Sequence, residues 1–301
     1  MRISTNQIFQ MSLTAMLNKQ SQVSETQLQL ATGKRQLVPS DDPSATSRVM
    51  QLEEGLAALD QYNRNADFAE ARLKLSETTL TQAVDIVQRT RELAIYANND
   101  TLTAADRDTI AVEVEQLRQA MLQIANTRDN NGEYIYSGFN TGTAAILDDG
   151  AGNYTYQGDQ GDRLLQVGSD RRVSIGDPGD ELFMRIDDGA GGITSIFEVF
   201  DDFMTDLRAD APQGVTITQL DSALQTFSDT RASLGARMNS IEQQRSANVS
   251  VELLMQENLS ELEDLDYTEA VSRFEQQLLA LQAAQQSFSR VQGLSLFNYL
   301  R

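Results

Sequence analysis

Apolar residues recur every three or four positions along most of the chain, which is the spacing of one face of an α-helix. The longest such pattern follows Pro43 and continues to Val87. The positions that carry it are Leu52, Leu56, Leu59, Asn63, Ala66, Glu70, Leu73, Glu77, Leu80, Val84 and Val87. A repeat of period 3.5 that lasts this long predicts long helices that wind around one another.

Capping residues mark where these helices begin. Asp42 is expected to cap a helix whose first residue is Pro43. After the stretch NNDTLTAADRD, Thr103 and Asp106 form a capping-box pattern that predicts the next helix. The apolar spacing continues there and returns after residue 214. The positions are Ile110, Val114, Leu117, Met121 and Ile124, then Leu220, Leu224, Phe227, Arg231, Leu234, Met238 and Ile241.

Residues 138–204 follow a different pattern. Thirteen of the 18 glycines lie between Gly138 and Gly214, and the apolar runs NYTYQ, RLLQV and RRVSI each end at or before a glycine. Short runs between turn signals predict a small β-rich module inserted between the helices. Its Asp-Gly clusters are expected to be tight turns, because they lack the full spacing of an EF-hand calcium loop.

The two ends of the chain share one pattern. The apolar period runs through Phe9, Leu13, Met16, Gln20, Val23, Gln27 and Leu30, and through Tyr267, Val271, Phe274, Leu278, Leu281, Gln285, Phe288 and Gln292. Two helices of matched length and period predict an antiparallel pair. The predicted fold is therefore mainly α: a long antiparallel helical rod with paired terminal coiled-coil helices and a small inserted β domain.

The terminal helices are poor in charge. Between Ile8 and Thr32 only Lys19 and Glu25 are ionisable, and between Gln276 and Leu300 only Arg290 is. A helix face in contact with water normally carries charged residues.

The energetics of a lone terminal pair are unfavourable. Ordering the backbone of Phe9 to Leu30 costs about 22–44 kcal/mol. The five apolar seam residues return about 7–15 kcal/mol when buried. We therefore expect these helices to be poorly ordered in the monomer and to fold when several subunits pack together. A simple intramolecular two-helix core is the alternative.

Composition excludes several classes of function. The net charge of −20 and the isoelectric point near 4.3 argue against nucleic acid or an anionic membrane as a partner. The chain has no Cys and no His, so thiolate chemistry and a Ser-His-Asp triad are impossible. Neither a secretory signal nor a membrane-spanning run is predicted, and no cofactor or metal is expected.

Two alternatives from other classes stay open. A hydrolase built on carboxylates of the β module would need two acids that converge in a cleft. The acidic stretch ELEDLDYTE is more simply a solvated helix face than such a pair. A cytoplasmic coiled-coil scaffold would carry charged flanking positions on its terminal helices, which this chain lacks.

Four segments resemble the bacterial flagellin family. LATGKRQLVPSDDPSAT is similar to the N-terminal signature of the family, SLGARMNSIE to the return segment of its rod domain, and DLDYTEAVSRFEQQLLALQAAQQSFSRVQGLSLFNYL to its C-terminal signature. IANTRDNNGEYIYSGFNTGT resembles the members that form the junction between hook and filament. A small filament flagellin is the alternative within the family.

The resemblance implies a division of the chain into five segments. Residues 1–40 and 263–301 would form the inner, coiled-coil core domain, residues 41–137 and 205–262 the two parts of the rod domain, and residues 138–204 the variable domain. The family is structural rather than enzymatic, so no catalytic residue is expected.

The resemblance also implies partners and a location. The expected partners are hook-associated protein 1, filament flagellin, copies of the chain itself in a ring, and a flagellar export chaperone. The protein would reach the outside of the cell through the export channel, without a cleaved signal peptide.

The residues expected at the subunit interface are Phe9, Leu13, Met16, Val23, Leu30, Phe274, Leu278, Leu281, Phe288, Val291, Leu294, Phe297, Tyr299 and Leu300. The chaperone is expected to bind Phe274, Leu278, Leu281, Phe288 and Val291.

Overall fold

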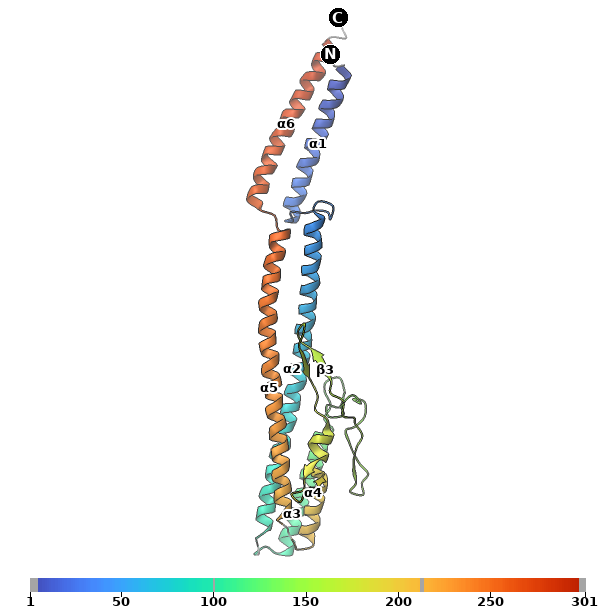
Figure 1. Ribbon diagram of the computed structural model, residues 1–301, viewed down its shortest axis with the longest axis vertical. Helices are drawn as coiled ribbons and strands as arrows, with labels where there is room; N and C mark the ends of the chain where they lie inside the picture. The colour runs from blue at the N-terminus through green and yellow to red at the C-terminus, as the bar shows by residue number, and fades with distance from the viewer. Residues whose placement is uncertain (1–4, 100, 212–213, 298–301) are drawn as a thin grey trace. The chain divides into compact units, whose positions relative to one another are not determined.

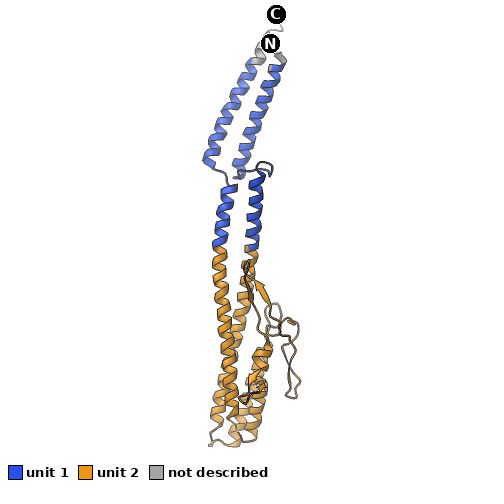
Figure 2. Ribbon diagram, in the orientation of Figure 1, with its two compact units in different colours: residues 1–58, 250–301 blue, residues 59–249 orange. Residues whose placement is uncertain are grey.

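The computed structural model describes residues 5–99, 101–211 and 214–297, with the side chains of residues 5, 6, 8 and 291–297 excepted. The chain forms two compact units, which Figure 2 shows in different colours. Unit 1 consists of residues 1–58 and 250–301, and unit 2 of residues 59–249. Long helices make up most of both units, which confirms the predicted fold class.

Unit 1 contains the two terminal helices, α1 (Thr5–Thr32) and α6 (Tyr267–Phe297), which lie side by side in Figure 1. They are antiparallel, because the ring of Phe9 near the start of α1 packs on Phe288 near the end of α6. The predicted pairing of the two chain ends is therefore confirmed.

Unit 1 also contains the start of α2 (Pro43–Ala97) and the end of α5 (Val215–Glu263). The two connections to the terminal helices are hydrogen-bonded to each other. The Arg35 N–H donates to the Glu263 carbonyl at 2.7 Å, and the Leu265 N–H donates to the Gly33 carbonyl at 3.0 Å. Asp42 caps α2 as predicted, since its Oδ1 accepts from the N–H groups of Ser44 and Ala45.

Unit 2 packs α2 and α5 with two shorter helices, α3 (Ala104–Ala125) and α4 (Ile196–Arg208). The predicted capping box of α3 is confirmed: the Asp106 N–H donates to Thr103 Oγ1, and the Thr103 N–H donates to Asp106 Oδ2. The Thr103 hydroxyl also donates to Asp106 Oδ2, at 2.7 Å, and this hydrogen bond, with that of the Thr103 N–H, lowers the pKa of Asp106.

Helix α4 is not among the predicted elements. Ser195 and Glu198 form a second capping box at its start, with both N–H···O distances at 3.0 Å. The side chains that α4 buries are Ile196, Phe197, Val199, Phe200, Phe203, Met204 and Leu207. The apolar residues of this segment recur at helical spacing, but the glycine-rich sequence around them predicts strands.

The strands form three antiparallel pairs of two to three residues each. They are β1 (Ile146–Asp148) with β2 (Tyr154–Tyr156), β3 (Leu164–Gln166) with β4 (Arg172–Ser174), and β5 (Ile186–Asp187) with β6 (Ile193–Thr194). A short π-helix, η1 (Asp180–Met184), precedes β5. The pairs belong to the same compact unit as the helices around them, because their inward side chains join the helical core.

Aromatic rings fill the core where the strand pairs meet the helices. Phe183 of η1 packs on Tyr136, Phe197 and Phe227, with ring centroids 5.3, 6.4 and 5.7 Å apart. All four rings are fully buried. The Tyr136 hydroxyl lies 2.5 Å from that of Thr79 on α2, and burial raises the pKa of Tyr136. This cluster therefore joins residues from α2, α4, α5, η1 and the loop after α3.

In the YIYSG stretch, alternation of the two tyrosines with Ile135 would predict a short strand, but the side chains do not alternate between two sides. Ile135 and Tyr136 are both buried, whereas Tyr134 is half-buried and stacks with Arg128. Gly138 turns the chain with a φ of +67°, and a Cβ there would lie 2.3 Å from the Asp159 carbonyl oxygen. Only glycine fits this close approach.

Arg72 is the most deeply buried guanidinium that forms ion pairs in the described part of the chain. Its side chain is 3% exposed, and its Nη1 lies 2.8 Å from Asp129 Oδ2 and 3.4 Å from Glu133 Oε2. Arg163 also binds Glu133, at 2.6 Å. The network ties α2 to the loop after α3 and to the residues before β3.

Replacing Gly138 by alanine is expected to destabilise unit 2 by about 3 kcal/mol or more, because strain at positive φ adds to the contact with Asp159. The matched control is Gly132→Ala. Its φ is +82°, but nothing lies within 4 Å of the added methyl, so only about 1–2 kcal/mol is expected. Urea unfolding followed by circular dichroism measures both, and equal losses would contradict the packing argument.

Arg72→Leu is expected to cost about 3–5 kcal/mol, because it leaves the Asp129 carboxylate buried without its cation. The control is Arg64→Leu on the same helix, whose ion pair with Asp60 is exposed and contributes under about 1 kcal/mol. The same urea titration separates them. A loss for Arg72→Leu no larger than that of the control would show that the buried network does not stabilise the fold.

Candidate subunit interface on the terminal helices

The contact between α1 and α6 is a narrow seam with few large side chains. The rings of Phe9 and Phe288 lie 5.1 Å apart, tilted by 41°. Further along, Thr26 Oγ1 donates to Gln277 Oε1 at 2.8 Å, and Thr26 is buried. A hydrogen bond of this kind adds about 1 kcal/mol, much less than a buried leucine.

The helical period predicted for α1 and α6 is confirmed, but several residues predicted to face the partner helix are exposed instead. On α1 the inward positions step from Phe9 through Leu13, Met16 and Val23 to Leu30, with Lys19 and Thr26 between the last three. The residues predicted inward but exposed are Gln20, Gln27, Tyr267, Val271, Leu278 and Gln285. For each of these except Tyr267 the preceding residue lies further inward: Lys19, Thr26, Ala270, Gln277 and Ala284. Small and polar side chains thus occupy several seam positions, and larger apolar ones lie beside the seam.

Two strips of apolar side chains are therefore exposed. On α1, Leu17 and Leu28 are eleven residues apart, and hence on one face, with exposed fractions of 53% and 51%. On α6, Tyr267, Val271 and Leu278 share a face and are also exposed. We call these two sets the flanking strips. Met11 and Leu279 are exposed as well, at 65% and 66%.

The predicted interface residues fall into four groups. Val23 is buried between the helices, and Leu278 is exposed on a flanking strip. The half-buried ones are Phe9, Leu13, Met16, Leu30, Phe274, Leu281 and Phe288. Val291, Leu294 and Phe297 lie in α6 but their side chains are outside the described part, and Tyr299 and Leu300 lie outside the described residues altogether.

The prediction of interface residues omitted Leu17, Leu28, Val271 and Leu279. Leu17, Leu28 and Leu279 are large apolar residues in charge-poor stretches that lie outside the predicted seam, whereas Val271 lies on that seam. Most of the large seam residues are only half-buried and the flanking strips are open, so the terminal pair leaves an apolar surface that a further helix could cover.

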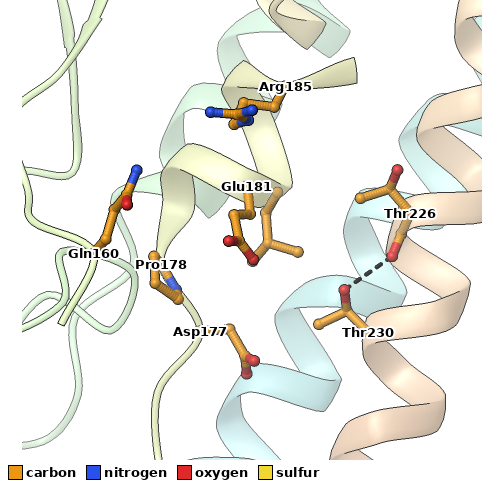
Figure 3. A pocket seen from close by; sticks show the side chains of 8 residues that line it. Gln160, Asp177, Pro178, Glu181, Arg185, Thr226 and Thr230 are labelled. Atoms are coloured by element: carbon orange, nitrogen blue, oxygen red, sulfur yellow. Dashed lines mark hydrogen bonds between the residues drawn. The ribbon is translucent and has the colours of Figure 1, made fainter. Parts of the chain in front are cut away.

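One cleft in unit 2 brings two acids together, as a carboxylate hydrolase would require. Its volume is about 440 Å³, and Asp177 and Glu181 line it. Figure 3 shows Glu181 and Arg185 across from Thr226 and Thr230 of α5. Two acids therefore share one cleft, as that alternative requires.

The chemistry of this cleft does not support hydrolysis. Asp177 accepts hydrogen bonds from both terminal nitrogens of Arg237, at 2.5 and 3.2 Å, and so is already engaged in an ion pair. A glycosidase needs two carboxyl groups that are both free to act on the substrate. No aromatic ring is found among the described residues that line the cleft.

A second group of acids and phenols in unit 2 has shifted pKa values. Burial raises the pKa of Asp201, whose Oδ1 binds Arg118 at 2.8 Å and whose Oδ2 accepts from the Tyr154 hydroxyl at 3.1 Å. Burial also raises the pKa of Tyr154. These groups link α3, β2 and α4 and do not line the cleft, so their arrangement is structural.

The Asp-Gly clusters behave as turns. Asp149 and Asp188 each accept backbone N–H groups of their own loops, at 2.7–3.2 Å. The pKa of Asp149 is lowered first by the Asn153 side-chain amide, which donates to it at 2.7 Å, and then by the backbone groups; backbone groups lower the pKa of Asp188. In the described part of the chain no three acidic side chains come together as metal ligands. None of the described helices is long and apolar enough to cross a bilayer.

Comparison with known proteins identifies the family. The model of the bacterial flagellin N-terminal helical region matches residues 3–141, and that of the flagellin C-terminal helical region matches residues 217–300. The two matches contain both terminal helices, all of α2 and α3, and nearly all of α5. The segment between them contains the strand pairs and α4.

Full-length relatives narrow the assignment. The chain is 32% identical to flagellar hook-associated protein 3 of Escherichia coli (strain K12), with 99% of each chain covered. It is 30% identical to flagellar hook-associated protein 3 of Salmonella typhimurium, with both chains covered completely.

A solved structure shares the fold. The crystal structure of the flagellar junction protein FlgL from Legionella pneumophila superposes with a TM-score of 0.63, at 21% identity, over 71% of this chain and 99% of that one. The chain is therefore a member of the bacterial flagellin family, in the group of flagellar hook-associated protein 3, and a structural component of the flagellum.

Proposed function

We propose that this protein is the subunit of the hook–filament junction. A ring of its copies would connect the hook, through hook-associated protein 1, to filament flagellin. The observation that carries the proposal is the end-to-end similarity to two hook-associated proteins 3, which extends through the segment between the two flagellin matches. The protein would act by binding alone, without catalysis.

The terminal helices would supply the binding surface. Seven large side chains are exposed among those that the structure describes on α1 and α6: Met11, Leu17, Leu28, Tyr267, Val271, Leu278 and Leu279. Covering each by a neighbouring subunit would stabilise the assembly by about 1 kcal/mol or more. Few charges would be desolvated along most of this surface, because only Lys19 and Glu25 are ionisable between Ile8 and Thr32, and only Arg290 between Gln276 and Leu300; the other charges of α6 lie in its first turns, at Glu269, Arg273 and Glu275.

The same surface would serve during export. We infer that the chain leaves the cell unfolded through the flagellar export channel and that its net charge of −20 keeps free copies apart. An export chaperone would cover the apolar positions of α6, among them Phe274, Leu278, Leu281, Phe288 and Val291. Assembly would then exchange the chaperone for neighbouring subunits.

Location tests the proposed function directly. An epitope-labelled copy that supports swimming is expected at the boundary of hook and filament in gold-labelled electron micrographs. Label along the whole filament would instead identify a filament flagellin. Purified protein is expected not to grow into long filaments from short flagellar seeds.

Leu17→Gln combined with Leu28→Gln is expected to reduce the protein in purified flagella about tenfold or more, because two apolar contacts are lost in every copy. The unfolding free energy of the free chain is expected to change by under about 0.5 kcal/mol, since both side chains are exposed. The control is Val112→Gln on α3, equally exposed, which should leave incorporation unchanged. Normal incorporation of the double variant would remove the flanking strips from the interface.

Hydrogen exchange of the free chain tests whether the terminal helices need their neighbours. Amides of α1 and α6 are expected to exchange far faster than those of Leu73 to Val87, whose seam is buried. Slow exchange through both terminal helices of a dilute monomer would contradict folding on assembly and favour the intramolecular core.

A further inference from the structure

A small hollow lies in unit 1 beside the loop that joins α1 to α2. Its volume is about 210 Å³, and Leu37, Val38, Pro39 and Val49 form its apolar wall. The ion pair between Lys34 Nζ and Glu263 Oε1, at 3.1 Å, belongs to the same lining. Sites for small molecules usually measure about 300–1,000 Å³, so this hollow is suited to one or two side chains.

Two arginines are adjacent in the chain to residues that line this hollow. Arg35 and Arg48 are next to lining residues in the chain, and both are exposed. Neither forms an ion pair with any residue that the structure describes. The nearest acids in sequence are already engaged: Asp41 accepts from the N–H groups of Leu37 and Val38, and Asp42 caps α2. The surface is therefore an apolar hollow with two guanidinium groups beside it in the chain that form no ion pair with any described residue.

The end of α5 in unit 1 has the complementary character. Leu253 and Leu254 are adjacent in the chain and are 58% and 57% exposed. Glu252 and Glu257 flank them, and neither forms an ion pair in the described part of the chain. No Lys or Arg occurs between Ser250 and Ser272, so this stretch is an apolar knob with a negatively charged surround.

We propose that Leu253 and Leu254 of one copy dock into the hollow of a neighbouring copy, where Glu252 and Glu257 face Arg35 and Arg48. Leu253 and Leu254 do not line the hollow of their own copy. Knob and hollow are different surfaces, so the contact is heterologous and continues from copy to copy around a ring. The inference rests on the proposed function only in requiring adjacent copies in the flagellum, and it involves neither flanking strip.

Charge reversal on each surface tests the pairing. Arg35→Glu with Arg48→Glu, and separately Glu252→Arg with Glu257→Arg, are each expected to lower the protein in purified flagella about threefold to tenfold, because like charges would then face each other. The four changes together are expected to restore incorporation to within about twofold of the original. Arg64→Glu, an exposed change on α2 in unit 2, is the control and should have no effect. No loss in either double variant, or no recovery in the combined one, would overturn the proposal.

A disulfide tests the contact itself, since the chain has no cysteine of its own. Val38→Cys with Leu253→Cys is expected to give a ladder of covalent multimers in oxidised flagella, because each copy would be linked to two neighbours. Each single variant should stay free of such a ladder, and so should Val38→Cys with Val112→Cys.

The outcomes separate this inference from the proposed function. If the labelled original chain is absent from the junction, the proposed function fails. If the variant with both cysteines is incorporated at the junction but forms no ladder of multimers, the junction role stands and the proposed knob-and-hollow contact is wrong. That holds whether the hollow is covered by another protein or by nothing. If the cysteine pair is not incorporated, the charge-reversal result decides.

Discussion

The seam between α1 and α6 is the constraint on which the rest of this protein depends. Its apolar positions, such as Met16 and Val23, alternate with small or polar ones, and Thr26 meets Gln277 through a single hydrogen bond. Such a seam sets the direction and register of the two helices but buries little apolar surface. The larger side chains lie beside it, where they can contact other subunits. A stronger internal seam would make the monomer more stable and the assembly less favourable.

Unit 2 differs from the terminal pair, because it places its largest aromatic side chains inside its own core. Its core is closed by fully buried rings around Phe183, and the ion-pair network of Arg72 joins α2 to the loops. Unit 2 therefore buries a continuous apolar core of its own. The proposed function combines this core with a terminal pair whose open apolar side chains would be covered by neighbouring subunits. The strand pairs share the core of the helices, so they add to unit 2 instead of forming a separate unit.

The negative charge and the charge-poor ends act at different stages. Repulsion among acidic copies opposes association in solution, whereas the ends contain few ions that burial would have to desolvate. The proposed contact between the α5 knob and the loop hollow adds a third element, since it uses charge for specificity. A heterologous pair of surfaces would give a ring or a helical array of copies instead of a two-fold dimer. In this proposal the apolar strips would supply affinity, and the complementary charges would select the register.

The sequence by itself determined the helices, their starts at Pro43 and Ala104, and the pairing of the two chain ends, because capping and the 3.5-residue period are local properties. It also determined the family, through segments that span both terminal helices. Only the tertiary structure decided which alternate positions face inward, since Thr26 or Gln27 can each follow Val23 and the surface of α6 selects between them. The tertiary structure also decided α4. Its aromatic face can be recognised as a buried helix face only once Phe183 and Phe227, which are distant in the chain, are known to belong to the same core. Long-range packing, unlike helix period, is not encoded in any short stretch.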